Sequence, residues 1–154
     1  KIMFKKISLL LLLCSLLSCG YQPLYQNEND FDKPINNFNF EGDKRTNKII
    51  ISFLGLKKVN NSKKGYSLTL KNKKIIDVVS KDKNGNPSVY KMSLMVNLIL
   101  SDNDKILKKK EFKANFIYNN TKNKFGLSQY QKNIETNLIN ELSEKIFIFL
   151  RTKK

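Results

Sequence analysis

The chain has 154 residues, of which 29 are Lys or Arg, 13 are Asp or Glu and none is His, so its formal net charge is +16. Hydrophobic residues make up 40% of the chain, which is enough for one folded domain and argues against a disordered tail. The absence of His removes the commonest general base and metal ligand, and only two Cys are present, so a zinc, redox or disulfide framework is excluded.

The positive charge has two competing explanations. It favours an anionic partner, which could be a phosphate-rich glycolipid, a membrane surface or a nucleic acid. Against this, Lys, Asn and Ile are all abundant, as expected where an A·T-rich coding bias sets the surface composition and the lysines form an ordinary solvated face. Both explanations stay open on composition alone.

Residues 1–18 have the pattern of a secretory signal peptide. Lys5 and Lys6 form a positively charged start, residues 7–17 form an apolar run, and Ser18 is a small residue before the cleavage point. A transmembrane helix needs about 18–20 apolar residues, so this run is too short to span a bilayer, and an uncleaved signal anchor is the less favoured alternative. Removal of three lysines with this segment leaves a charge of +13.

Cys19 is the predicted lipidation site. Leu16 and Ser18 stand three positions and one position before it, as in a bacterial lipobox, whereas Cys14 follows the bulky Leu13. A diacylglycerol and an N-acyl chain on Cys19 would anchor the protein, because each buried methylene contributes about 0.8 kcal/mol. We therefore expect a tether over residues 19–34, which are rich in Asn, Asp and Gln, and one domain over residues 35–154.

The domain begins with a predicted short strand and a predicted helix. Phe38 and Phe40 alternate with polar residues, which is the period of a strand. Asp43 is a suitable N-cap for a helix over residues 44–58. The β-branched run at 49–51 and Gly55 argue against that helix.

Three strands in a meander are predicted next. Residues 66–79 form one long strand, interrupted, if anywhere, at 71–74, and Asn84-Gly85 predicts the following hairpin because both residues tolerate positive φ. Residues 101–104 mark a second turn. The expected apolar faces of the two later strands are Tyr90, Met92, Leu94, Val96, Leu98 and Leu100, and then Phe112, Ala114, Phe116 and Tyr118.

A closing helix is predicted over residues 127–150, with Ser128 as its cap. Its apolar residues recur at spacings of three and four, and they are Leu127, Tyr130, Ile134, Leu138, Leu142, Ile146 and Phe149. The order βαβββα predicts an α+β two-layer sandwich, in which a mostly antiparallel four-stranded sheet carries two helices on one face.

Four features together resemble the LptE family, the lipoprotein subunits of the outer-membrane lipopolysaccharide translocon. They are C-G-Y-Q-P-L-Y after the lipobox, the hairpin K-N-G-N-P-S-V-Y-K-M-S-L-M-V-N-L-I-L, the aromatic strand F-K-A-N-F-I-Y-N-N and the striped C-terminal helix. The resemblance implies a domain that is tethered to the periplasmic face of the outer membrane. There it would plug and help assemble an LptD-like β-barrel partner, and it would bind lipopolysaccharide without covalent chemistry.

The resemblance also points to lysines. The family's basic contact in the hairpin falls on Lys83, while a second contact near the last helix falls on Leu127, with Lys122 and Lys124 close by. One exposed ion pair contributes only about 0–1 kcal/mol, so a phosphate site needs a cluster. In a meander the first turn and the break before the last helix lie at the same end of the sheet, and we therefore expect Lys81, Lys83, Lys122 and Lys124 to form the glycolipid-binding site.

Other functions have weaker support in the sequence. No nucleophile has a base beside it and no Gly-rich phosphate loop is present, so we expect no enzyme, no metal and no cofactor beyond the acyl chains on Cys19. Asp102 and Asp104 lack the rest of a calcium loop. Aromatic residues on a sheet also suggest a single-strand nucleic-acid binder, but an export signal makes nucleic acid an unsuitable partner. The main alternative is a periplasmic lipoprotein adaptor of a transport system that makes no glycolipid contact.

Overall fold

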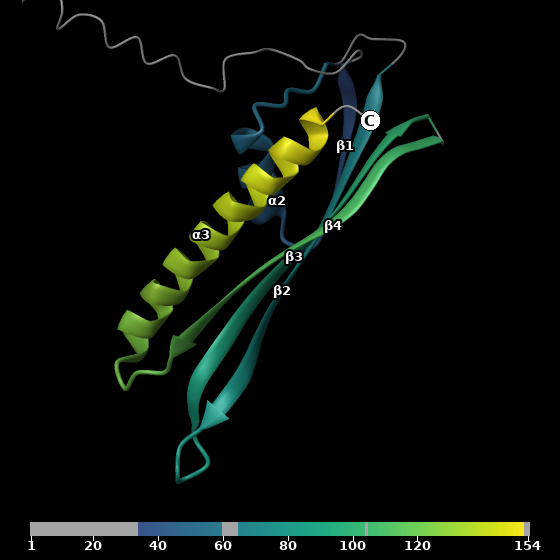
Figure 1. The fold of residues 1–154 in the computed structure, drawn as a ribbon. Coiled ribbons are helices and arrows are strands. Elements are labelled where there is room, and N and C mark those ends of the chain that lie inside the picture. Colours follow the sequence, from purple (N-terminus) through teal and green to yellow (C-terminus); the bar gives the residue numbers. More distant parts are fainter. Residues whose placement is uncertain (1–33, 60–64, 104, 153–154) are drawn as a thin grey trace, which may run out of the picture.

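The computed structural model describes residues 34–59, 65–103 and 105–152, so the signal peptide, Cys19 and almost all of the predicted tether lie outside the described residues. The described part is a two-layer α+β sandwich (Figure 1). Its elements in chain order are β1 (Ile35–Glu41), α2 (Lys44–Phe53), β2 (Tyr66–Lys81), β3 (Pro87–Asp102), β4 (Lys105–Asn119) and α3 (Lys124–Arg151).

The sheet has the strand order β1-β2-β3-β4, with β1 parallel to β2 and both other pairs antiparallel. Both helices cover the same face, and the long helix α3 runs along the sheet (Figure 1). This arrangement confirms the predicted fold class and the order βαβββα. The parallel β1–β2 pair follows from the crossover through α2, because a helix between two strands returns the chain to the edge where it started.

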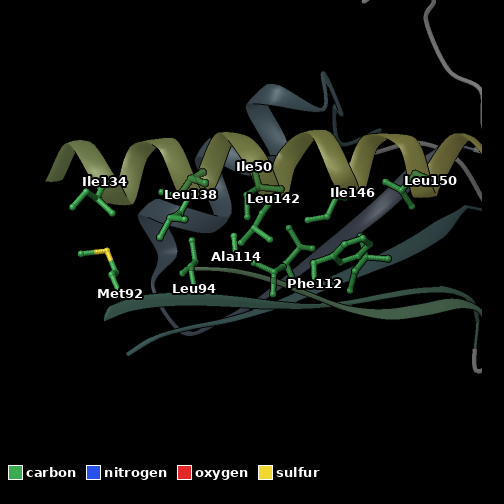
Figure 2. Close-up of a cluster of buried hydrophobic side chains, with 14 of the residues drawn as sticks. Ile50, Met92, Leu94, Phe112, Ala114, Ile134, Leu138, Leu142, Ile146 and Leu150 are labelled. Carbon is green, nitrogen blue, oxygen red and sulfur yellow. The ribbon is translucent and has the colours of Figure 1, made fainter. Parts of the chain in front are cut away.

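The core lies between α3 and the central strands. Alternation along β3 places Leu94, Val96 and Leu98 on the helix-facing side, where each has an exposed fraction of 1% or less. Leu142 and Ile146 of α3 are fully buried against this face (Figure 2). Ile50 of α2 completes the cluster with no exposed surface, so the predicted apolar faces of β3 and α3 do form the core.

Helix α3 begins earlier than predicted, at Lys124, and its N-cap is Asn123 and not Ser128. The side-chain oxygen of Asn123 accepts a hydrogen bond from the backbone N–H of Gly126 at 3.0 Å, which satisfies one of the unpaired donors of the first turn. Tyr130, which the spacing placed in the apolar stripe, is 45% exposed.

Helix α2 is capped as predicted but is shorter. The carboxylate of Asp43 accepts hydrogen bonds from the backbone N–H of Arg45 at 2.6 Å and of Thr46 at 3.2 Å. The helix ends at Phe53, five residues before the predicted end at residue 58. Gly55 has φ +66, a conformation that stops a helix and that favours glycine.

The side chain of Asn72 marks the point where β1 leaves the sheet. Its amide donates to the Asp43 carbonyl at 2.7 Å, and its carbonyl oxygen accepts from the Asp43 N–H at 3.1 Å. Gly42 has φ +85, and a Cβ at this position would lie 2.2 Å from the backbone carbonyl oxygen of Asn72. Glycine is therefore required at this turn into α2. Among the described residues, β2 has no strand on its outer side beyond Lys71.

Strand β2 pairs continuously with β3 through the stretch 71–74, where an interruption was allowed for. The register shifts lie instead between Val78 and Lys81, next to the hairpin. The hairpin that Asn84-Gly85 predicted is present; in its turn Gly85 adopts φ +82, whereas Asn84 does not adopt positive φ. The Gly85 N–H donates to the Asp82 carbonyl. This bond is typical of a three-residue hairpin loop whose last residue is a glycine in the left-handed conformation.

Candidate functional site

The four predicted site lysines are all exposed and all lie toward one end of the sheet. Lys81 is the last residue of β2, Lys83 lies in the hairpin loop, Lys122 lies in the β4–α3 linker and Lys124 is the first residue of α3. The lysines after the second turn lie at the opposite end, as the meander predicts.

Asn120 joins the linker to the hairpin. Its backbone N–H donates to the Ser88 carbonyl at 2.8 Å, and its side-chain amide donates to the Pro87 carbonyl at 2.7 Å. Pro87 is the cross-strand partner of Lys81, so these bonds hold the linker next to the β2 end of the hairpin. Lys124 also donates to the side-chain oxygen of Asn120 at 3.4 Å.

The hairpin loop extends beyond the end of β4 and beyond the start of α3 (Figure 1). The last β3–β4 pair at this end is Val89 with Asn119, so the loop has no β4 neighbour. Lys83 therefore lies farther out than Lys81, Lys122 and Lys124. These four lysines, called the lysine row below, are spread from the β4–α3 linker to the hairpin loop.

Asp82 gives the loop its shape. Its carboxylate accepts hydrogen bonds from the backbone N–H groups of Asn86 at 2.8 Å and Asn84 at 2.9 Å. These bonds, led by the one from Asn86, lower the pKa of Asp82 below its ordinary value. At neutral pH the loop therefore contains a carboxylate between Lys81 and Lys83, whose charge is partly compensated by the backbone N–H groups.

The positive charge beside the linker has no such compensation from its own segment. Residues 112–134 contain Lys113, Lys122, Lys124 and Lys132 and no Asp or Glu. At about 4 Å and an effective dielectric of about 20, one ammonium–phosphate pair gains roughly 4 kcal/mol before desolvation, and much less when fully exposed. A phosphate-binding site would therefore need several lysines, and several lysines occur at this end of the molecule.

Three tyrosine rings meet near the same end of the sheet, a contact that sequence patterns do not predict. Tyr118 stacks on Tyr90 with ring centroids 5.7 Å apart and meets Tyr130 edge to face at 6.1 Å. Burial raises the pKa of Tyr118, whose hydroxyl oxygen accepts a hydrogen bond from Gln131 at 2.8 Å. Phe125 in the first turn of α3 is 75% exposed, so apolar surface and ammonium groups occur together here.

Phe116 differs from its prediction as a core residue. It occupies the helix-facing side of β4 opposite Met92, as the alternation requires, yet it is 45% exposed. Strand β4 is the edge of the sheet, so no further strand shields the outer side of this ring. Its strand neighbours Phe112, Ala114 and Tyr118 are buried, as predicted.

Lys108, near the opposite end, has a structural role that sequence reasoning missed. Its ammonium donates to the carbonyl oxygens of Phe149 at 3.2 Å, Leu150 at 2.7 Å and Thr152 at 2.9 Å. A cation at this position satisfies the unpaired carbonyls of the last turn of α3 and interacts favourably with the helix dipole.

A cavity of about 320 Å³ lies between the start of α2, the outer part of β2 and the middle of α3. Ile49, Ile76 and Met92 are among the apolar residues that line it. An ion pair from Lys74 to Glu135, with 2.8 Å between nitrogen and oxygen, joins β2 to α3 at its side. This pair neutralises two of the lining charges, and the remaining ones are Asp43, Arg45 and Lys132.

Among the described residues, no three His, Cys, Asp or Glu side chains are grouped so that they could hold a metal ion. No helix in the same residues is both long enough and apolar enough to cross a bilayer.

Comparison with protein-family models and with curated protein sequences finds no match. Solved structures do match over most of their length. Rare lipoprotein B from Shewanella oneidensis aligns with a TM-score of 0.59 at 12% identity, over 75% of this chain and 93% of that one.

Two further lipoproteins agree with this match. A minor lipoprotein from Acinetobacter baumannii aligns with a TM-score of 0.57 at 11% identity, over 75% of this chain and 88% of its own. Lipoprotein B from Nitrosomonas europaea aligns with a TM-score of 0.59 at 11% identity, over 79% of this chain and 88% of its own. At these identities the likeness shows that the chain shares the fold of bacterial lipoproteins.

Proposed function

We propose that the protein is an LptE-like outer-membrane lipoprotein that binds lipopolysaccharide and plugs and helps assemble an LptD-like β-barrel. The observation that carries this proposal is the exposed row of lysines from the β2–β3 hairpin to the β4–α3 linker, two segments that the bonds of Asn120 hold together. The fold shared with bacterial lipoproteins and the lipobox before Cys19 support the same reading.

The proposed ligand contacts follow from the chemistry of the row. Lys81, Lys83, Lys122 and Lys124 would meet the phosphates of the glycolipid, whose negative charges are spaced across its headgroup. Phe125 and the Tyr130 edge would meet its apolar part, since both are exposed beside the lysines. Acyl chains on Cys19 would hold the domain at the periplasmic face of the membrane.

Glycolipid binding is tested with the double variant Lys83→Asp/Lys124→Asp. Its matched control is Lys105→Asp/Lys109→Asp, which makes the same change of charge at the other end of β4. We expect the first variant to bind lipopolysaccharide micelles at least about tenfold more weakly, and the control to lose much less, because long-range attraction falls within a Debye length of about 10 Å. Equal binding by the parent and the first variant would remove the lysine row from the proposal.

The partner is tested by crosslinking in native membranes, followed by identification of the crosslinked protein. Recovery of a large β-barrel protein is expected. The alternative function, a periplasmic adaptor without glycolipid contact, predicts that no barrel protein is recovered and that neither the parent nor either lysine variant binds lipopolysaccharide specifically. This alternative is supported by the abundance of Lys, Asn and Ile, which is expected where a coding bias sets the surface composition.

Anchoring is tested by Cys19→Ala. Without the acyl chains the protein is expected to leave the membrane fraction or to accumulate in the wrong compartment. An unchanged membrane fraction would contradict lipidation at Cys19.

A further inference from the structure

The outer edge of β4 differs along its length. Among the described residues, β4 has β3 on one side and no strand on the other, so a row of backbone N–H and C=O groups is available to a further strand. Soluble proteins usually protect such edges with charges, prolines or bulges, because an open edge pairs readily with other chains. The first part of β4 has this protection: Lys105, Lys109 and Lys110 are exposed and the register shifts between Leu100 and Ser101 of β3.

The second part, Ala114–Asn119, has none of these devices. It contains no charged residue and no proline, and its register with β3 is continuous from Asn119 back to Lys108. Phe116 on the helix-facing side is 45% exposed and Ile117 on the open side is 56% exposed. A single added strand would cover both side chains at once, because successive residues of a strand point to opposite faces.

The free half of β2 makes a less suitable edge. It contains Lys73, Lys74 and Lys81, and two register shifts between Val78 and Lys81 interrupt its pairing next to the hairpin. Such shifts twist an edge and interrupt a ladder. At the other edge, β1 is shorter, its register shifts between Ile35 and Asn37, and the Ile35 carbonyl already accepts a hydrogen bond from the Val59 N–H. The second part of β4 is therefore the longest unprotected stretch of edge among the described residues.

We infer that this edge binds an extended peptide segment of a partner protein, which adds to the sheet as a fifth strand beside Ala114–Asn119. Backbone hydrogen bonds would supply much of the affinity, and side chains on alternate positions would supply specificity. The inference does not rest on glycolipid binding, since the strand pairing uses the backbone and apolar side chains of β4 whether or not the nearby lysines contact lipopolysaccharide.

The charges around the edge define the chemistry of the segment. Lys113 precedes the apolar stretch, Lys122 and Lys124 follow it, and no acid occurs between Glu111 and Glu135. A complementary segment is apolar in its middle and carries Asp or Glu at one end or both. A second copy of this chain is disfavoured as the occupant, because its own edge brings the same lysines and a net charge of +16.

The test uses the full-length protein in the cells that produce it, with a photocrosslinking amino acid at Asn115, Ile117 or Asn119. These three residues alternate along the open face of β4. The expected result is that all three crosslink to one segment of one partner protein and that the crosslinked positions there shift by two residues at each step. The segment is expected to be apolar with flanking acids.

The matched variants are Ile117→Lys and Ile106→Lys. The two isoleucines lie on the same strand and are 56% and 55% exposed, but only Ile117 lies in the unprotected stretch. We expect Ile117→Lys to reduce the crosslink from Asn115 by about tenfold or more, as loss of one covered aliphatic side chain implies, while Ile106→Lys leaves it within about twofold. Thermal unfolding of each purified variant shows whether the domain still folds.

Four results would overturn the inference: no crosslink from any of the three positions, adducts with lipopolysaccharide, adducts with a second copy of the chain, or adducts scattered over a partner without a two-residue step. Failure of the proposed function would be seen separately. It would appear as equal lipopolysaccharide binding by the parent and by Lys83→Asp/Lys124→Asp, a result that leaves the β4 crosslinks of the parent protein to be judged on their own.

Discussion

The substitution Asn72→Ala tests what fixes the β1–α2 unit to the sheet. Asn72 is 6% exposed, and both ends of its amide bond the backbone of Asp43 at the turn between β1 and α2. The variant removes two hydrogen bonds, each with a net contribution of about 1 kcal/mol, and leaves two partly buried backbone groups with incomplete hydrogen bonding. We expect the free energy of unfolding to fall by about 2–3 kcal/mol, which for a domain of this size lowers Tm by roughly 6–15 °C.

Urea denaturation followed by circular dichroism measures the loss, with Asn37→Ala, an exposed amide on β1, as the control. Amide hydrogen exchange should speed up first in the turn between β1 and α2 and in the first turn of α2, because β1 itself stays paired with β2 from Ile35 to Glu41. Asn72→Asp keeps the acceptor but loses the donor, so it should also be destabilised. If Asn72→Ala costs no more than Asn37→Ala, the two hydrogen bonds do not hold the turn and the reasoning fails.

Three further predictions concern backbone strain, helix capping and pH. Gly55→Ala should cost about 1 kcal/mol from positive φ alone, and Gly42→Ala distinctly more, because its Cβ would lie 2.2 Å from a β2 carbonyl oxygen; urea denaturation compares the two. Lys108→Ala should destabilise the domain by about 1 kcal/mol and speed amide exchange in the last turn of α3, whereas Lys109→Ala, with an exposed side chain, should do neither. The folded-state pKa of Asp82 is lowered, so its carboxylate stabilises the hairpin above the unfolded pKa of about 4. This stabilisation is lost as pH falls through the folded-state pKa. Amide exchange in residues 83–86, measured relative to β3, should rise only in that acid range.

The periodic spacing of apolar residues correctly predicted the elements that are buried on one face along most of their length. Strand β3 is central, so Leu94, Val96 and Leu98 repeat every second residue and specify both its face and its neighbours. The stripe of α3 likewise identified Leu142 and Ile146. These patterns are local, so they can be recognised in the sequence without knowledge of the fold.

Features that depend on residues far apart in the sequence could not be predicted from it. Lys108 and Leu150 are 42 positions apart, and nothing in either segment indicates that one caps the other. Phe116 satisfies the strand period, but its exposure depends on β4 being an edge strand, with no strand beyond it among the described residues. The N-cap of α3 was misplaced because Asn123 and Ser128 are both good caps, and only the observed fold selects Asn123.

The candidate site was predictable only at the level of topology. The meander placed Lys81 and Lys124 toward the same end of the sheet, and pairing of Val89 with Asn119 agrees with this. The bonds of Asn120 and the projection of the hairpin past β4 could not be foreseen, since they depend on where each strand stops. The gathering of Tyr90, Tyr118 and Tyr130 depends on contacts between three elements.

The lysine row and the β4 edge lie close together but differ in the forces that they would use, and salt should separate them. Raising the ionic strength from about 0.1 to 1 M shortens the Debye length from about 10 to 3 Å, so binding that depends on Lys83 and Lys124 should weaken strongly. Backbone hydrogen bonds and coverage of Ile117 respond much less to salt, although recruitment by the flanking lysines should slow. We therefore expect lipopolysaccharide binding to fall steeply with NaCl while the crosslink yield from Ile117 at equilibrium falls only modestly. A parallel loss of both would mean that charge alone brings partners to this end of the molecule, and the added strand would then have no independent support.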